Sequence, residues 1–300
     1  MSGPLLRFED GKIALGGKDL LVKSASLSLA PTLNAERVYG DYDPEIAGAR
    51  TEFVNFAPVE NLKGTLDISF FIYANEFAEG GYPNTINRMF DIYKGMDEKP
   101  INQNLVGRYA FDNMFLKSFS FSLNPFEIII ANAKYDIFGS VSRSVSRRFQ
   151  HTDANFAHGL KSFGSIAASA SSKDEFEIAS LNYNIIVNRQ VHNKIRASEN
   201  TFANSQPGGV IPARVSVESI EKEMVIECSE MVENLNVYGD QQSGTTPEGL
   251  ADSKISAFLL SMTGEKIAKF SASGKIQSQS LSISEGQYAK SSISIKEIVV

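Results

Sequence analysis

The chain has 300 residues, of which 42% are apolar, 21% charged and 10% aromatic, so it is long enough for two globular domains, each with its own core. Its 29 basic and 35 acidic residues give a net charge of −6, which disfavours proteins that grip a nucleic-acid backbone or an anionic membrane. A single cysteine excludes an internal disulfide framework and a cysteine-based zinc cluster. No apolar stretch approaches the roughly 18 residues of a membrane span, so we expect no membrane insertion.

The first predicted element is a hairpin between Leu5 and Val22, interrupted by Gly16 and Gly17. The glycines and Lys18 come close to a phosphate-binding loop. With Gly11 and Gly16 as its first and second glycines, that motif needs a lysine directly after Gly16 and then a serine or threonine, but Gly17 follows Gly16 and Asp19 follows Lys18. We therefore interpret these glycines as a tight turn between two strands.

Apolar and polar residues alternate in several later segments, which predicts half-buried β-strands. The polar member of the alternation is usually serine and seldom lysine or glutamate. Such a face is expected to be covered by neighbouring protein or to line a neutral surface, because strands that face solvent usually carry more charge. The alternating segments are 27–29, 66–70, 119–123, 281–283 and 293–295.

The sequence repeats itself, which indicates a duplicated unit. A shift of 154 residues places 25–29 over 179–183 and, without a gap, Leu66 over Ile220 and Phe70 over Met224. A shift of 160 then aligns 116–123 with 276–283 and sets Tyr135 on Ile295 and Phe138 on Ile298. The fold class that follows is mainly β, with two tandem, homologous β-sandwich or barrel domains.

Each unit is expected to carry one flanking α-helix and one long arm. Apolar residues at helical spacing predict helices over Asn84–Lys94 and Asp252–Met262, each followed closely by glycine. The polar excursions Ala35–Glu60 and Arg189–Pro212 occupy the same place in the two halves, and loops of that length are uncommon unless they have a function. We interpret both as docking arms.

A serine-rich segment separates the units, so we predict a β domain with the N-terminal hairpin over residues 1–139, a linker or arm over 140–173, and a second β domain over 174–300. Arg143, Arg147 and Arg148 in the linker could bind phosphate. A solvated arm, or one that docks on an acidic neighbour, is the preferred interpretation, given the acidic balance of the chain.

Asp41, Asp43, Glu45 and Glu52 stand at positions one, three, five and twelve of a calcium-binding loop, but Ile46 replaces the glycine that its turn requires. We interpret this segment as a solvated acidic loop.

The candidates for catalysis do not form a motif. The three histidines, His151, His158 and His192, lie in the linker and in the second long loop, and Cys228 has no histidine nearby in the sequence. The pair Asp97 and Glu98 lies in a loop without an apolar pocket that could raise either pKa. We predict no catalytic, cofactor or metal site, and therefore a structural protein in place of an enzyme. Two similar units in one chain could alternate around a ring, so that three chains close with pseudo-sixfold symmetry.

The segment 26–34 (Ser-Leu-Ser-Leu-Ala-Pro-Thr-Leu-Asn), the loop with 54–59, the strand 64–70, a helix and a closing pair of strands together resemble the tail tube proteins of tailed bacteriophages. Their fold is shared with the inner tubes of contractile injection systems. The resemblance covers residues 20–138 and 174–300. It implies that strands join between neighbouring units around a lumen, and that the long loops reach the adjacent ring.

The resemblance also implies a set of partners and a location. The chain would bind copies of itself in rings and stacked rings, meet sheath, tape-measure and baseplate proteins, and enclose double-stranded DNA in transit. It would be made in the cytoplasm of the host bacterium and lie in the tail of the virion. A tail terminator or a baseplate component of the same fold is an alternative within this class.

Two alternatives belong to other classes. The first is a tandem β-sandwich that binds carbohydrate or a receptor. Tyr39, Tyr42 and Tyr82 in predicted loops favour it, and the absence of tryptophan argues against it. The second is a hydrolase whose residues are scattered without a motif.

Overall fold

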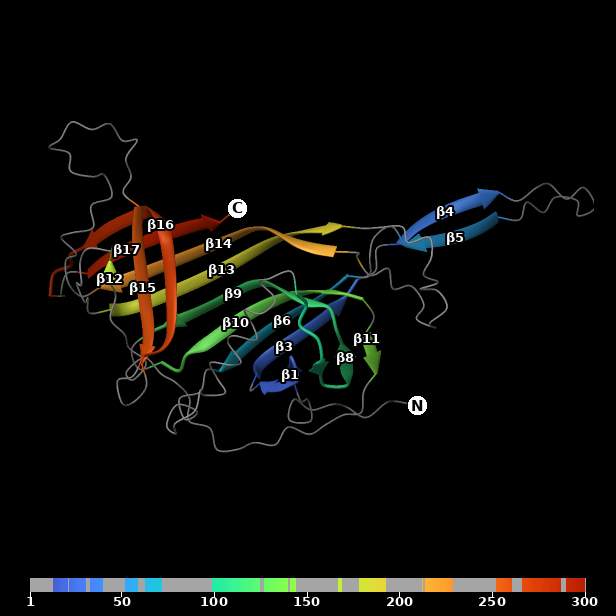
Figure 1. Cartoon of the computed structure of the whole chain (residues 1–300), viewed down its shortest axis with the longest axis horizontal. Coiled ribbons are helices and arrows are strands. Elements are labelled where there is room, and N and C mark those ends of the chain that lie inside the picture. The colour runs from blue at the N-terminus through green and yellow to red at the C-terminus, as the bar shows by residue number, and fades with distance from the viewer. Residues whose placement is uncertain are drawn as a thin grey trace, which may run out of the picture.

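The computed structural model shows a mainly β protein (Figure 1). The structure describes residues 13–20, 22–30, 33–39, 52–58, 63–71, 99–124, 127–139, 141–143, 167–168, 178–192, 212, 214–228, 252–260, 266–286 and 290–299. Within these residues all regular structure is β-strand, and every strand pair is antiparallel.

The largest element is a ten-stranded sheet that contains strands from both halves of the chain. Its order is β3-β6-β10-β9-β13-β14-β17-β16-β15-β12. The strands are β3 (Val22–Leu29), β6 (Lys63–Phe71), β9 (Met114–Leu123), β10 (Ile130–Phe138), β12 (Ala167–Ala168), β13 (Ile178–His192), β14 (Arg214–Cys228), β15 (Asp252–Leu260), β16 (Lys266–Ser282) and β17 (Lys290–Val299).

A five-stranded sheet of short strands lies against the first half of this large sheet. Its order is β11-β8-β7-β1-β2, and its strands are β1 (Ile13–Leu15), β2 (Lys18–Leu20), β7 (Asn104–Val106), β8 (Tyr109–Phe111) and β11 (Val141–Arg143). Gly16 and Gly17 connect β1 to β2 with φ of 60° and 76°, the left-handed conformation that a two-residue hairpin turn requires. The predicted tight turn is therefore confirmed for the described residues 13–20. Strand β11 lies in the segment expected to be a linker.

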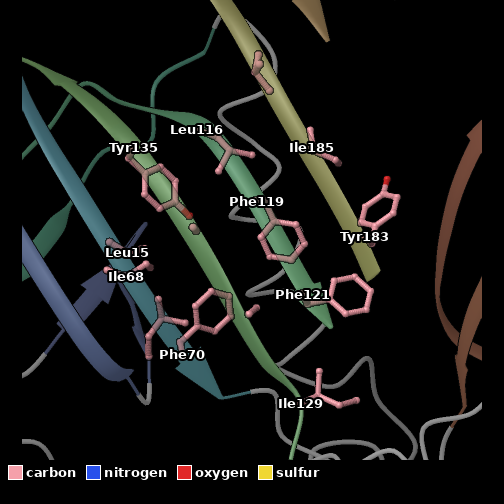
Figure 2. Packing of buried hydrophobic residues seen from close by; sticks show 14 of the residues in the cluster. Leu15, Ile68, Phe70, Leu116, Phe119, Phe121, Ile129, Tyr135, Tyr183 and Ile185 are labelled. Carbon is pink, nitrogen blue, oxygen red and sulfur yellow. The ribbon is translucent and has the colours of Figure 1, made fainter. Parts of the chain in front are cut away.

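One apolar face of the ten-stranded sheet forms the core (Figure 2). Strands β6, β9, β10, β13, β14 and β17 contribute alternate residues to it, as their period-two pattern predicts. Leu15 of β1 approaches Ile68 and Phe70 of β6, which joins the small sheet to the large one. Phe121 of β9 and Tyr183 of β13 have ring centroids 5.8 Å apart. One hydrophobic cluster therefore extends through both halves of the chain.

The ten-stranded sheet contains the same four-strand order twice. Block one is β3-β6-β10-β9. Block two is β13-β14-β17 and the part of β16 over 275–282 that pairs with β17. The two blocks also follow the same path along the chain. In each block the chain forms the first and second strands of this spatial order, then the fourth strand (β9 or β16), and finally the third strand (β10 or β17). β9 pairs with β13, and we call this pairing the inter-block ladder. It joins the fourth strand in space of block one to the first strand of block two.

The pairing within the blocks also repeats residue by residue. Tyr135 of β10 lies opposite Leu66 of β6, and Ile295 of β17 lies opposite Met224 of β14. Tyr135 and Ile295 are 160 positions apart, as the repeat predicts, so Leu66 corresponds to Met224, an offset of 158. Leu66 in turn lies opposite Leu27 of β3, and Met224 lies opposite Tyr183 of β13, which gives an offset of 156 for the first strand.

Two β-bulges of each block fall at corresponding residues. The β9·β10 ladder skips Lys117, and the β16·β17 ladder skips Gln277, at an offset of 160. The β3·β6 ladder skips Lys23, and the β13·β14 ladder skips Ala179, at an offset of 156. A bulge locally bends and twists a strand, so two matching bulges in each block give the blocks similar local geometry.

The offset of 154 that the sequence suggested for the first two strands is therefore wrong. It placed Leu27 on Leu181 and Leu66 on Ile220, two and four positions from their structural counterparts. Both errors are even numbers of residues. Because side chains alternate with period two, an even slip leaves the apolar residues on the same face, and the hydrophobic pattern cannot reveal it.

The helix predicted over Asp252–Met262 is also wrong, because Asp252–Leu260 is strand β15, which pairs with β16 along its whole length. Ile255, Phe258 and Leu259 fit a helical stripe, whereas Ile255, Ala257 and Leu259 fit an alternating strand. A short apolar segment fits both periods, and pairing with a strand distant from it decides the outcome. The helix predicted over Asn84–Lys94 lies outside the described residues.

The predicted arms are partly strands. β4 (Leu33–Tyr39) and β5 (Glu52–Pro58) form a two-stranded hairpin, which Figure 1 shows projecting from one end of the large sheet. In the second half, β13 and β14 stay paired beyond the sheet as far as His192 and Arg214. Apart from Pro212, the rest of both predicted arms lies outside the described residues. Both excursions thus begin as extensions of the hairpin that opens each block.

Gly274 lies next to Lys275, the residue at which the pairing of β16 with β15 ends and its pairing with β17 begins. A Cβ at this position would lie 2.3 Å from the backbone oxygen of Lys296, a contact that a side-chain rotation cannot relieve. We expect Gly274→Ala to lower the free energy of unfolding by about 1–3 kcal/mol through overpacking. Thermal melting followed by circular dichroism measures the effect, with Ser273→Ala at the exposed neighbouring position as control. Equal melting of both variants and the parent would contradict the close approach.

Candidate functional site: a polar sheet face between two open edges

The face of the large sheet opposite the core is polar. Along β6, β9, β10 and β13, the residues between the buried ones include many serines and asparagines, together with charged residues such as Lys63, Asp67, Lys134 and Asp136. Two shallow hollows lie on this face, one across β9, β10, β13 and β14 and one across β3, β6, β9 and β10. We call this surface the polar face; it includes Ser24, Ser26, Ser69, Ser118, Ser120, Ser122, Asn132, Asn182 and Asn184.

The charges of the polar face are largely paired across neighbouring strands. Lys134 Nζ lies 3.3 Å from Asp67 Oδ1 in block one, and Lys296 Nζ lies 2.9 Å from Glu221 Oε2 in block two. The hydrogen bond and charge of Lys296 lower the pKa of Glu221, and Glu221 in turn raises the pKa of Lys296. Glu221 and Lys296 therefore stay charged near neutral pH. In both pairs the two opposite charges lie close together, so their fields largely cancel at a distance.

A small apolar cluster closes one end of the polar face. Phe115 of β9 and Phe138 of β10 pack edge to face with centroids 5.9 Å apart, and Val215 of β14 covers them. Arg189 lies over the Phe115 ring, with the guanidinium carbon 5.6 Å from its centroid, and Nη1 donates a hydrogen bond to the carbonyl of Leu116. The extension of the β13·β14 hairpin is thus anchored to block one.

The guanidinium group of Arg189 is partly buried. Burial lowers the pKa of Arg189 to about 10, and the nearby carboxylate of Asp136 partly opposes that shift. The guanidinium therefore remains charged at neutral pH, as arginine almost always does. Its cation–π contact and its hydrogen bond fix the direction in which the hairpin leaves the sheet.

We expect Arg189→Gln to lower the free energy of unfolding by about 1–3 kcal/mol, because it leaves a buried carbonyl without a charged donor and removes the contact with Phe115. Arg143→Gln on the exposed strand β11 is the matched control and should melt like the parent protein. The measurement is thermal melting at neutral pH. If both substitutions left the melting temperature unchanged, Arg189 would not anchor the hairpin.

The inter-block ladder pairs six residues of each strand. Its register runs from Leu181 opposite Leu123 to Ile186 opposite Ser118. Phe121 and Tyr183 meet on the apolar side of this ladder. On the opposite side, Ser120 and Asn184 face each other on the polar face. The core and the polar face therefore both continue from one block into the next.

The two outer edges of the paired blocks are open within the part of the chain that the structure describes. β3 pairs with β6 on one side and with no described strand on the other. β16 pairs with β15 only up to Lys275, so its remaining residues pair with β17 alone. Since β3 corresponds to β13 and β16 to β9, these edges correspond to the two strands of the inter-block ladder.

The residues singled out for chemistry do not assemble into a site in the described structure. Glu52 begins β5, and Asp41, Asp43 and Glu45 of the acidic loop lie outside the described residues. His192 ends β13, with Nε2 2.8 Å from Ser216 Oγ, and Cys228 ends β14.

Arg143 is described and ends β11, whereas several other candidates lie outside the described residues. Among the described residues, no group of three or more acidic, histidine or cysteine side chains is placed to hold a metal ion. The candidates outside the described residues are His151, His158, Asp97, Glu98, Arg147, Arg148, Tyr42 and Tyr82.

Comparison with known proteins gives no family. No protein-family model matches the chain, and no curated protein matches its sequence. Within the described residues, no helix has the length and apolar character needed to cross a membrane. A functional assignment therefore has to come from the repeated blocks, the polar face and the open edges.

Proposed function

We propose that this chain is a structural protein that assembles into rings, and that the stacked rings form the tail tube of a bacteriophage. The observation that carries the proposal is the head-to-tail repeat of two blocks in one sheet. In finer terms, we propose that the blocks are two homologous β-sandwich or barrel domains, related by duplication, with the hairpin extensions as their arms. The protein is then not an enzyme.

The arrangement of edges supports association with copies of the same chain. The open edge β3 corresponds to β13, and the open edge β16 corresponds to β9, the strand that pairs with β13 in the inter-block ladder. The edge β16 of one copy therefore complements the edge β3 of another. Such a head-to-tail interface generates a ring when the rotation closes and a helical filament when it does not. Closure also removes both open edges, which otherwise invite unspecific pairing. Three copies would present six blocks around the axis.

The polar face supports a lumen through which DNA can pass. The opposite face is apolar and forms the core, so the polar face is the side of the sheet available for a wet channel. Serine and asparagine provide neutral polar groups, and the paired charges leave little net field to retain phosphates. Together with the net charge of −6, this surface is suited to a channel through which DNA slides without being bound tightly.

The proposed partners follow from a tail tube. Copies of the chain join within and between rings, double-stranded DNA occupies the lumen, and sheath, tape-measure and baseplate proteins bind the tube in the virion, after synthesis in the cytoplasm of the host bacterium. The arms at the end of the sheet are the segments that we assign to contacts between stacked rings.

Sedimentation velocity over a range of protein concentrations tests this function. We expect discrete species several times the mass of the 32.8 kDa chain, followed by larger stacked species at higher concentration. A chain that remains monomeric at every concentration and binds glycans on an array would contradict the proposal and support the carbohydrate-binding alternative.

A further inference from the structure

We propose that copies of this chain join through one defined antiparallel ladder, in which β3 of one copy pairs with residues 278–283 of the next copy in the register of the inter-block ladder. The inference rests on the proposed function, since it names the contact by which a ring would close. Its basis is the inter-block ladder, in which the corresponding strands already make this contact within one chain.

The register follows from the offsets between the blocks. Tyr183 corresponds to Leu27 at an offset of 156, and Phe121 corresponds to Leu281 at an offset of 160. Since Tyr183 lies opposite Phe121 in the inter-block ladder, Leu27 of one copy lies opposite Leu281 of the next. The other pairs of the proposed ladder are Ala25 with Ile283, Ser26 with Ser282, Ser28 with Ser280, Leu29 with Gln279 and Ala30 with Ser278.

Two of the three core-side pairs of the proposed ladder are apolar, Leu27 with Leu281 and Ala25 with Ile283, and the third places Leu29 opposite Gln279. Leu27 and Leu281 take the places of the packed rings of Tyr183 and Phe121, so an apolar pair again meets on the core side. Ser28 and Ser280 take the places of Asn184 and Ser120 on the polar face. A register shifted by one residue would place leucine opposite serine and break both faces.

Exposed apolar side chains lie on the edges that this ladder would cover. Leu29 on β3 is 43% exposed, Leu281 on β16 is 47% exposed, and Ile283 directly after β16 is 73% exposed. In the inter-block ladder, Leu29 corresponds to Ile185, Leu281 to Phe121 and Ile283 to Leu123. These three counterparts are almost completely buried. Pairing between copies would therefore bury these side chains as the internal pairing does, which favours association.

A second contact follows from the same correspondence. Ile298 near the end of β17 corresponds to Phe138 at an offset of 160, yet Ile298 is 58% exposed, whereas Phe138 is buried under Val215. Val215 belongs to the extension of the β13·β14 hairpin, and the corresponding extension in block one is the β4·β5 hairpin. The proposed junction would bring that hairpin of one copy towards Ile298 of its neighbour.

Paired cysteines in the full chain test the register. In a Cys228→Ser background, which removes the cysteine of the parent sequence, Ser28→Cys and Ser280→Cys are introduced together. Opposite residues of an antiparallel ladder have Cα atoms roughly 4.5–5.5 Å apart, within the range of a disulfide. The two positions lie on strands far apart in the sheet of one chain, so a bond between them links two copies. Mild oxidation should give reducible multimers on a denaturing gel.

The control pair, Ser26→Cys with Ser278→Cys, uses exposed serines of the same two segments. These residues are four positions out of register, roughly 13 Å along the strand at about 3.3 Å per residue, which is beyond the reach of a disulfide. We expect at least tenfold less multimer from the control. Equal yields from both pairs, or a higher yield from the control, would overturn the register.

Sedimentation of the Cys228→Ser background under the same conditions separates the two levels of the proposal. Rings that form without cross-linking of the matched pair would overturn the ladder and leave the ring-forming function standing. Failure of the background to associate at any concentration would overturn the function and the ladder together. Circular dichroism of each variant establishes that it is folded, and a misfolded pair is replaced by the in-register pair Ser26→Cys and Ser282→Cys.

Discussion

Met224→Asp is expected to abolish the native fold at room temperature. Met224 is completely buried in the hydrophobic cluster, opposite Tyr183 on one side and Ile295 on the other. A carboxylate there has no partner in the cluster, and an isolated buried charge is far more costly than a lost methyl group. We expect a loss of about 4 kcal/mol or more in the free energy of unfolding. Circular dichroism and differential scanning calorimetry measure it.

The effect should not be confined to the second half of the chain. The cluster that contains Met224 also contains Leu66 and Phe119 of block one, and the inter-block ladder joins the two blocks. We therefore expect one weakened cooperative transition. Asn182→Asp introduces the same charge on the polar face of β13 and should change the stability by less than about 1 kcal/mol. A separate, unchanged transition for block one in Met224→Asp would show that the cores are independent.

Leu281→Glu is expected to weaken assembly strongly and leave the single chain folded. Leu281 is half exposed in the single chain, so the charge stays in water there, but assembly would bury it opposite Leu27 of the neighbour. An unpaired charge at an interface costs on the order of 1–3 kcal/mol, or roughly tenfold to a hundredfold in the concentration needed for assembly. Sedimentation velocity measures that concentration.

A charge exchange sharpens this test. Adding Leu27→Lys to Leu281→Glu would place a lysine opposite the glutamate in every junction, so the double variant should regain part of the lost assembly. Tyr109→Glu on β8 alters a comparably exposed residue away from both edges and should assemble like the parent. Equal loss in the single and double variants would indicate that Leu27 and Leu281 do not meet.

The alternation of polar and apolar residues predicted the mainly β fold and the buried face of the central strands, whereas the apolar residues Leu29, Leu281 and Ile283 of the segments 27–29 and 281–283 are exposed. Segments such as 66–70 and 119–123 occupy strands of the large sheet with their apolar residues buried, as expected. Alternation depends on the local chain alone, because successive side chains of any strand point to opposite faces. The hairpin turn at Gly16 and Gly17 was predictable for a similar reason, since its chemistry is contained in the turn.

The features that depend on distant parts of the chain were not predictable in detail. The segment Asp252–Leu260 fits helix and strand alike until β16 pairs with it. The register of the repeat was two and four residues off in the first two strands, because even slips preserve the apolar face. The inter-block ladder and the open edges have no local signal. The serine-rich alternation did indicate that the second face of these strands is polar, which agrees with the polar face.

Electron microscopy of the assembled protein tests the central claim most directly. Class averages viewed down the particle axis should show a hollow ring with six similar lobes, two from each of three chains, and side views should show such rings stacked into a tube. Compact single particles without a central hole, at concentrations where the protein is folded and soluble, would contradict the account.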